Sequence, residues 1–214
     1  MWRVQASATQ QSVLPDGVMD IMWFQNRLVF AGPGTRAMTV STSPGEVTVG
    51  LRLPPGVAHT LLQVSAQELV DLNVDLQAVT PHAAALERRF DGDPGKLLEQ
   101  VLAELWRRAE PDHGLLSLAA SLDHSAHQGK RLAEIACAHN MSERSLRRIH
   151  DRLFGYGPNS LLQIHRFQKA LQLVQDGLAL GDAAASAGYF DQAHFTRDAK
   201  KLSGRTPARL AAGL

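Results

Sequence analysis

Short runs of alternating apolar and polar residues fill the first third of the chain. The clearest is 47–53 (VTVGLRL), in which valine and leucine occupy every second position. This period of two is expected of a strand with one buried face. Turns rich in glycine and proline separate the runs. We therefore expect strands at 17–24, 27–32, 37–43, 47–53 and 59–64, arranged as an antiparallel sandwich or half-barrel.

Helical periodicity replaces this alternation after residue 65. Ser65 is suited to cap a short helix at 66–71, and Thr80 followed by Pro81 predicts a helix whose first residue is proline. Residues 96–109 (KLLEQVLAELWRRA) form a longer amphipathic pattern. The first part of the chain is therefore expected to combine a β-rich module with several helices.

We place a domain boundary at 109–113, where the letters AEPDHG combine a helix stop with a turn. The expected domains are 1–110 and 111–214, and the second should begin with a helix at 114–125. The whole chain has a net charge of +1, but the first domain carries −3 and the second +4. A modestly basic second domain is compatible with phosphate contact, and equally with an ordinary solvated surface.

Residues 136–161 and 185–210 resemble each other at a constant offset of 49, with no gap. Gly155 corresponds to Gly204. Ser142 corresponds to Asp191, and serine and aspartate are both good N-cap residues for a helix. Each copy contains a short helix, a tight turn and a longer helix closed by glycine. That order of elements is a helix-turn-helix, and two copies in tandem predict a protein that reads DNA.

The two copies divide into support helices, turns and recognition helices. The first copy has these at 132–139, at Asn140-Met141 and at 142–154, and the second has them at 181–188, at Tyr189-Phe190 and at 191–203. A linker helix is expected between them at 159–175, closed by Gly177. A helix of this length spans about 25 Å. Successive major grooves recur about every 34 Å, so the linker suits two adjacent grooves.

The first recognition helix has one apolar and one cationic face. Its apolar stripe consists of Leu146, Ile149 and Leu153. The opposite face carries three arginines in the first two turns, Arg144, Arg147 and Arg148. Arginine is the side chain best suited to guanine O6 and N7 in the major groove. These arginines predict direct base contacts, and a merely solvated face is the alternative.

The second recognition helix presents a more mixed face. Phe195 and Leu202 should point inward. The outward positions are Gln192, Ala193, Thr196 and Arg197. Glutamine suits adenine, arginine suits guanine, and alanine can contact a thymine methyl. Lys200 and Lys201 lie farther along the helix and should meet phosphate. His194 fits either the DNA face or the packed face.

The C-terminal part resembles the AraC/XylS family of transcription regulators. The resemblance rests on LAEIA and MSERSLRRIHDRLFGYGP in the first copy, on RFQKAL at 166–171 and on GYFDQAHFTRDAKKLSGRTP at 188–207. It covers about residues 113–214 and implies a seven-helix domain whose two recognition helices enter adjacent major grooves. The base-contacting positions that it implies are Arg144, Arg147, Arg148, Gln192, Ala193 and Arg197.

Two residues depart from the family pattern. The family usually has phenylalanine two residues after each recognition-helix arginine, where this chain has His150 and Ala199. An aromatic core anchor is therefore lost or replaced in both copies, and looser packing is expected there. The second recognition helix also presents a single cation among its base-facing positions, so specificity is expected to depend more on the first motif.

The N-terminal half is similar to the short cupin-like module of some of these regulators, through LPDGVMDIMW, LVFAGPGTR and VGLRLPPGVAHTLL. This resemblance implies a ligand-sensing or dimerising part. The two helix-turn-helix copies of the C-terminal part predict double-stranded DNA as the partner of the chain. RNA polymerase, a small-molecule effector and a second copy of the chain (a homodimer) stay open as further partners, as does the choice between activation and repression.

Metal and cofactor chemistry has little support in the pattern. His124 and His127 lie at i and i+3, but no third ligand has a suitable spacing, so solvent-facing histidines are expected. His59 is the one histidine among the expected strands, which is too few for a catalytic cupin centre. Trp2, Trp23 and Phe30 could line a pocket, although core packing is their usual role. We expect no cofactor, no metal ion and no catalytic residue.

The single cysteine, Cys137, excludes an internal disulfide and is consistent with a reducing compartment. It is expected to lie on the apolar side of the support helix as an inert, buried thiol. The chain lacks an apolar run of about 18 residues and a signal-peptide pattern. A soluble, cytoplasmic protein without membrane contact is therefore expected.

The sequence as a whole predicts an α+β chain. Its first part is a β-rich sandwich or half-barrel module with helices, and its second an all-α domain with two helix-turn-helix motifs joined by a linker helix. The predicted function is sequence-specific DNA binding in transcription regulation, not catalysis. Two alternatives remain: an enzyme fused to a DNA reader, such as a metal-dependent cupin or an alkyl-accepting repair protein, and a regulator whose N-terminal half only dimerises.

Overall fold

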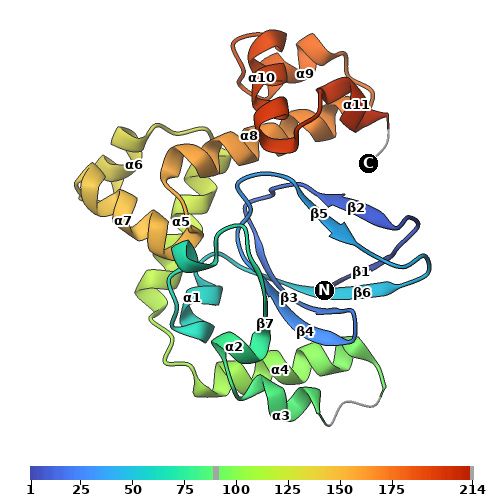
Figure 1. Ribbon diagram of the computed structural model, residues 1–214. Helices are drawn as coiled ribbons and strands as arrows, with labels where there is room; N and C mark the ends of the chain where they lie inside the picture. Colours follow the sequence, from blue (N-terminus) through green and yellow to red (C-terminus); the bar gives the residue numbers. More distant parts are fainter. Residues whose placement is uncertain (89–91, 213–214) are drawn as a thin grey trace.

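The computed structural model describes residues 1–88 and 92–212, and its N-terminal part contains two antiparallel sheets (Figure 1). The larger sheet has the strand order β1-β6-β3-β4-β7, and the smaller sheet pairs β2 with β5. The strands are β1 (Trp2–Gln5), β2 (Gln10–Val13), β3 (Met19–Phe24), β4 (Arg27–Ala31), β5 (Met38–Ser41), β6 (Val47–Leu53) and β7 (Asn73–Asp75). The expected arrangement of antiparallel strands is confirmed.

Helical segments follow β6. They are α1 (Val57–Leu62), the 3-10 turn η1 (Ala66–Leu69), α2 (Leu76–Val79), α3 (Ala83–Glu87) and α4 (Pro94–Arg108). Strand β7 lies between η1 and α2, and α2, α3 and α4 pack on the larger sheet. Helix α4 packs against β3 and β6. Its buried stripe of Leu97, Leu98, Val101 and Leu105 follows the helical repeat, so one continuous apolar face closes the N-terminal core.

Two expectations for this region are wrong. Residues 59–64 were expected to form a strand, but Val57–Leu62 is helix α1. Its buried side chains include Ala58, Leu61 and Leu62, at i, i+3 and i+4, which is the period of a helix face. The other concerns Thr80, which was expected to cap a helix beginning at Pro81. Thr80 instead ends α2, and α3 begins at Ala83, because the Ala83 N–H first closes a turn onto the Thr80 carbonyl.

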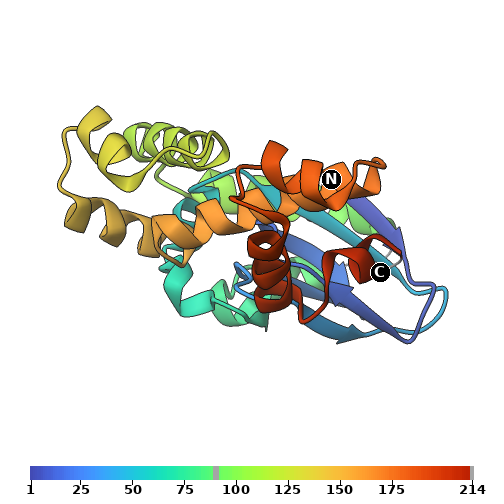
Figure 2. The same cartoon turned by 90° about the horizontal axis from the view of Figure 1, so that it is seen from above.

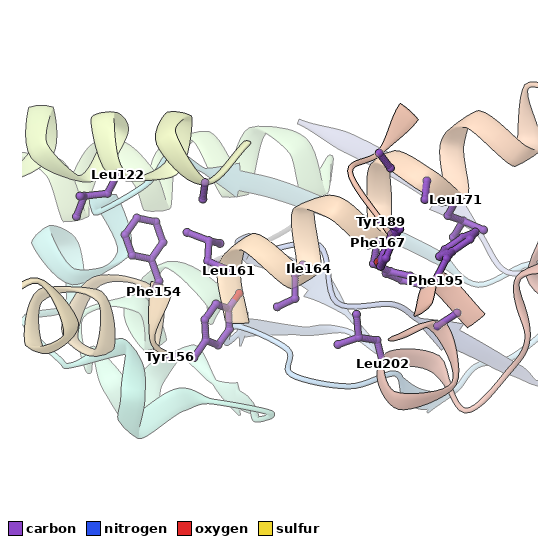
Figure 3. Close-up of a cluster of buried hydrophobic side chains, with 14 of the residues drawn as sticks. Leu122, Phe154, Tyr156, Leu161, Ile164, Phe167, Leu171, Tyr189, Phe195 and Leu202 are labelled. Atoms are coloured by element: carbon purple, nitrogen blue, oxygen red, sulfur yellow. The ribbon is translucent and has the colours of Figure 1, made fainter. Parts of the chain in front are cut away.

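The C-terminal part is entirely helical over the residues that the structure describes. Its elements are α5 (His113–His127), α6 (Leu132–Ala138), α7 (Glu143–Phe154), α8 (Pro158–Gln175), α9 (Leu180–Ser186), α10 (Gln192–Ser203) and α11 (Pro207–Ala211). Side chains along α8, including Leu161, Ile164 and Phe167, run through the centre of this core (Figure 3). The α6–α7 pair lies at one end of α8, and α9–α11 lie at the other (Figure 1).

The two parts of the chain have separate cores that dock closely. The N-terminal core includes buried residues up to Leu105, and the C-terminal core begins with Ala119. Seen from above, α9–α11 lie over the sheets (Figure 2). Backbone contact reaches across this junction, because the Ala37 N–H donates to the Leu202 carbonyl at 2.6 Å. Gln168 Nε2 also donates to the Pro15 carbonyl at 2.7 Å.

The longest helix within residues 1–88 and 92–212 is α8, which has 18 residues and carries polar side chains along its length. No helix in these ranges combines the length and hydropathy needed to cross a membrane.

Candidate DNA interface

The first helix-turn-helix is formed by α6 and α7, as expected. The carboxylate of Glu134 accepts a hydrogen bond from the Arg131 N–H at 3.0 Å, which fixes the start of α6. Asn140 then adopts φ +51°, and the Met141 N–H returns to the Ala136 carbonyl at 2.9 Å. This left-handed residue ends α6 tightly. The Ser142 side chain caps α7 by accepting from the Ser145 N–H at 3.1 Å.

The second helix-turn-helix, α9 and α10, is not an ungapped copy of the first. Recognition helices Glu143–Phe154 and Gln192–Ser203 correspond at an offset of 49, as expected. The support helices Leu132–Ala138 and Leu180–Ser186 instead correspond at 48. The sequence pairing of Ala136 with Ala185 is therefore wrong.

Burial and backbone geometry identify the extra residue of the second copy. Ile135 and Ala136 are the buried pair of α6, and Ala183 and Ala184 are the buried pair of α9. The left-handed residue of the second turn is Gly188, at φ +87°. Three residues separate it from the first residue of α10, where the first turn has two, so the second turn is one residue longer.

The arginine face of α7 is free of the core. Arg144, Arg147 and Arg148 are all exposed, while Leu146 and Leu153 are fully buried on the opposite side. Ile149 is only half-buried. Arg147 pairs with Glu143 at 3.4 Å across an exposed surface, and such pairs contribute about 0–1 kcal/mol. All three guanidinium groups can therefore turn toward a ligand at little cost.

The outward face of α10 is less cationic. Gln192, Ala193 and Arg197 are exposed, and Thr196 is half-buried with its hydroxyl donating to the Gln192 carbonyl at 2.8 Å. Asp191 caps the helix by accepting from the His194 N–H at 2.6 Å. The two lysines differ. Lys200 is exposed, but Lys201 Nζ donates to Gln163 Oε1 of α8 at 3.0 Å, so Lys201 is directed toward the linker helix.

His194 belongs to the packed side of α10. Its ring lies edge-on to Tyr189 at 5.1 Å between centroids, and its Nε2 lies 3.5 Å from Arg166 Nη2. Arg166 itself pairs with Asp198 at 2.9 Å and lies 4.2 Å above the Tyr189 ring. This cluster joins α8 to both helices of the second motif. Of the two roles open to His194, the structure places it in packing.

The two departures from the family pattern have different consequences. His150 is fully buried and its ring lies 5.0 Å from that of Phe154, so an imidazole replaces the expected phenyl anchor. Neither ring nitrogen has a hydrogen-bond partner among the described residues. Burial lowers the pKa of His150 to about 4, against a weaker raising effect of the Asp123 charge. Ala199 is also fully buried, with no large side chain in that place.

Cys137 was expected to be buried, and it is exposed. Helix α6 buries Ile135 and Ala136. Successive side chains of a helix are about 100° apart, so the next residue after this buried pair turns toward solvent.

The exposure of Phe190 was not predicted from the sequence. Phe190 is 93% exposed, while the adjacent Tyr189 is buried in the core. The cause is the longer second turn, since only one of the two aromatic rings can reach the core before Asp191 starts the helix. Phe190 therefore lies beside the first turn of α10, where a recognition helix meets DNA.

Comparison with known families fits this geometry. Residues 131–212 match a family described as a helix-turn-helix domain. They form an AraC-type helix-turn-helix domain. The chain is a DNA-binding transcription regulator. Residues 1–75 match a family described as a domain of unknown function (DUF6597). No curated protein matched the chain.

In overall fold, the chain is similar to solved structures of ToxT from Vibrio cholerae. An apo variant of ToxT from Vibrio cholerae is 12% identical and aligns over 98% of this chain and 99% of its own, with a TM-score of 0.50. Another ToxT structure from Vibrio cholerae is 11% identical over 99% and 95%, also with a TM-score of 0.50. The C-terminal domain of AraT, a response regulator from Geobacillus stearothermophilus, is 25% identical over 42% and 84%, with a TM-score of 0.39.

Proposed function

We propose that this regulator binds its operator by placing α7 and α10 in successive major grooves. The observation that carries the proposal is that both helices begin at a side-chain cap and expose polar side chains from their first two turns. In this arrangement the arginines of α7 read guanine, Gln192 reads adenine and Arg197 reads guanine. Ala193 and the methyl group of Thr196 meet thymine methyls, and Lys200 meets phosphate.

We further propose that residues 1–110 and 111–214 are separate domains. The two hydrophobic cores support this division, because the buried residues of the N-terminal core end at Leu105 and those of the C-terminal core begin at Ala119. The N-terminal domain is proposed as the sensor or dimerisation part. Contacts with RNA polymerase and a homodimer stay predictions from the resemblance, and we propose that the chain acts by binding, without an enzymatic step.

A cavity between the two sheets supports a sensor role. It has a volume of about 250 Å³, which suits a small molecule. Its apolar lining includes Trp2, Met22, Phe24, Met38 and Val40. The Trp2 indole donates to Asp20 Oδ1 at 3.0 Å, so one wall of the cavity is held in place. A small and mainly apolar effector fits this lining best.

The cavity also has a physical connection to the DNA-binding part. Leu14 and Pro15 line it, while Leu14 packs against the C-terminal core and the Pro15 carbonyl accepts from Gln168 of α8. An effector could change DNA affinity only if it binds more tightly to one of two arrangements of this junction. The alternative, an N-terminal half that only dimerises, predicts no ligand that raises the melting temperature.

Selection of bound DNA from a random pool tests the proposal, with the full chain as bait. We expect an enriched site with two blocks about one helical turn apart. Repeating the selection with Arg148→Ala should alter one block, and repeating it with Arg197→Ala should alter the other. A single enriched block, or the same block altered by both variants, contradicts the two-groove arrangement.

A further inference from the structure

Asp123 and His127 of α5 meet His165 of α8, which lies far from them in the sequence. His165 Nε2 lies 2.8 Å from Asp123 Oδ1, although the two residues are 42 positions apart. His127 Nδ1 lies 3.4 Å from Asp123 Oδ2, one helical turn along α5. The rings of His127 and His165 are stacked, with centroids 3.5 Å apart. Their potential ligand atoms all lie within 4.8 Å of one another.

We propose that Asp123, His127 and His165 bind a zinc-like divalent transition-metal ion. Two imidazoles and one carboxylate are a donor set that suits zinc. Bond lengths of about 2.0–2.2 Å in a tetrahedron put ligand atoms roughly 3.4 Å apart. The observed separations of 2.8 and 3.4 Å are close to that value. Small side-chain rotations are therefore enough to admit the ion.

The cluster has both a closed side and an open side, as a metal site requires. The His165 side chain is 6% exposed and Asp123 is 22% exposed, whereas His127 is 56% exposed. All three line a cavity of about 960 Å³ between the two parts of the chain. Solvent can therefore supply the ion and a water molecule as its fourth ligand.

The charges around the cavity allow a cation. Two arginines also line it, Arg52 and Arg166. Each is paired with a carboxylate, Arg52 with Asp16 at 2.7 Å and Arg166 with Asp198 at 2.9 Å. Lys169 is the remaining cation of the lining, and it is exposed. The positive charges of the two arginines are therefore neutralised by their own carboxylate partners, and the Asp123 carboxylate remains available to a cation.

His124, the residue that sequence spacing had paired with His127, is not part of the cluster. Its Nε2 lies 2.7 Å from Gln128 Nε2 on the exposed side of α5. Asp123 and His127 lie at i and i+4 on the side of α5 that meets α8, whereas the exposed His124 side chain turns to Gln128. His124 is thus a matched control on the same helix.

The position of the site gives the metal a structural role. It would clamp α5 to α8 at His165, next to Arg166, which anchors α10 through Asp198. His165 also touches the N-terminal part, because a Cβ at Gly17 would lie 3.0 Å from its Cε1. A metal ion here would join α5 to the linker helix α8, beside the N-terminal part.

Zinc titration of the full-length, chelator-stripped protein tests the proposal, with a competing chromophoric chelator as the readout. We expect one equivalent of zinc per chain in the wild type and in His124→Gln. Asp123→Asn and His127→Gln should bind at least about tenfold more weakly, since even residues that only support a ligand are typically worth about 10–100-fold. His127 is exposed, so His127→Gln is expected to keep the fold.

Two results overturn the proposal. One is the absence of stoichiometric zinc binding by the wild type at micromolar free metal. The other is equal affinity in the wild type, Asp123→Asn and His127→Gln, which would place the zinc on other surface histidines. Melting temperature provides a second readout, because a ligand bound only to the folded state raises it. Zinc should raise it for the wild type and His124→Gln, and should leave it unchanged for His127→Gln.

Discussion

Arg166 Nη2 lies 2.9 Å from Asp198 Oδ2 and joins the linker helix to the second recognition helix. The guanidinium also lies 4.2 Å above the Tyr189 ring, at the end of the second turn. The two charged side chains are only 22% and 10% exposed. Arg166 therefore helps to hold α10 in place against α8.

Asp198→Ala should destabilise the protein by about 3 kcal/mol, since it leaves the Arg166 charge buried without its partner. It should also weaken binding to the half of the operator read by α10, although Asp198 itself is buried. Chemical unfolding and binding to half-site variants measure the two effects. Equal loss of affinity for both halves would show that the pair supports the whole domain and not the placement of α10.

Arg148→Ala should cost about 1–3 kcal/mol of specific binding and relax the preference at one or two base pairs. The reason is the loss of a bidentate donor to guanine from the exposed face of α7. Lys200→Ala is the matched control, because a phosphate contact should weaken all sequences alike and reduce the salt dependence. Competition binding at several salt concentrations distinguishes the loss of a base contact in Arg148→Ala from the loss of a phosphate contact in Lys200→Ala. An unchanged base preference in Arg148→Ala would remove this face from the interface.

Phe190→Ser should weaken DNA binding without lowering stability. The ring is 93% exposed and lies beside the N-terminal end of α10, where aromatic carbon can contact a thymine methyl or a sugar. Phe195→Ser is the contrasting change, since Phe195 is fully buried and its loss should unfold the second motif. Melting temperature and operator affinity are the measurements. Wild-type affinity in Phe190→Ser would leave the ring outside the interface.

His150 should make stability depend on pH. Burial lowers the pKa of His150 from 6.5 to about 4. In the unfolded chain, His150 therefore becomes protonated as the pH falls below 6.5, whereas in the folded chain it stays neutral down to about pH 4. The free energy of unfolding should therefore fall as pH decreases through this window, on the order of 3 kcal/mol in all. His150→Phe, which restores the usual family residue, should lose this part of the slope.

Urea unfolding between pH 7 and pH 4 measures this slope. If His150→Phe keeps the full wild-type slope, then His150 is protonated in the folded protein.

Gly155→Ala should be more harmful than Gly204→Ala, although the two glycines end equivalent helices. Both have positive φ, at +84° and +70°, so each alanine costs about 1–2 kcal/mol. A Cβ at Gly155 would also lie 2.6 Å from Pro33 Cγ and 2.8 Å from Val70 Cγ2, whereas nothing lies within 4 Å at Gly204. Unfolding should show the larger loss for Gly155→Ala. Equal losses of stability in the two variants would mean that Pro33 and Val70 can move away from the added Cβ at Gly155 at little cost.

Much of the DNA-binding part could be predicted from local sequence. Helix starts at Ser142 and Asp191, the closing glycines and the arginine face of α7 follow from side-chain capping and from helical period. These are short-range effects that a few neighbouring residues decide. The strand at Val47–Leu53 was predictable for the same reason, because its alternation is strict.

Other features depended on what each segment packs against. Val57–Leu62 packs as a helix against α4 and α7, and a segment of six residues is too short for its apolar spacing alone to decide between helix and strand. The extra residue of the second turn could not be seen in the sequence, because the burial of Ala183 and Ala184 and the left-handed backbone of Gly188 show which residues correspond.

The sequence by itself determined the helix-turn-helix architecture and the polar outer faces of α7 and α10, because capping and periodicity act within a few turns. The tertiary structure alone decided which side chains face one another across helices. Asp123 and His165 meet, Arg166 reaches Asp198, and His150 becomes buried, all through the packing of helices around α8. Such pairings depend on the relative positions of whole helices, and these are set by the fit of many side chains in the shared core.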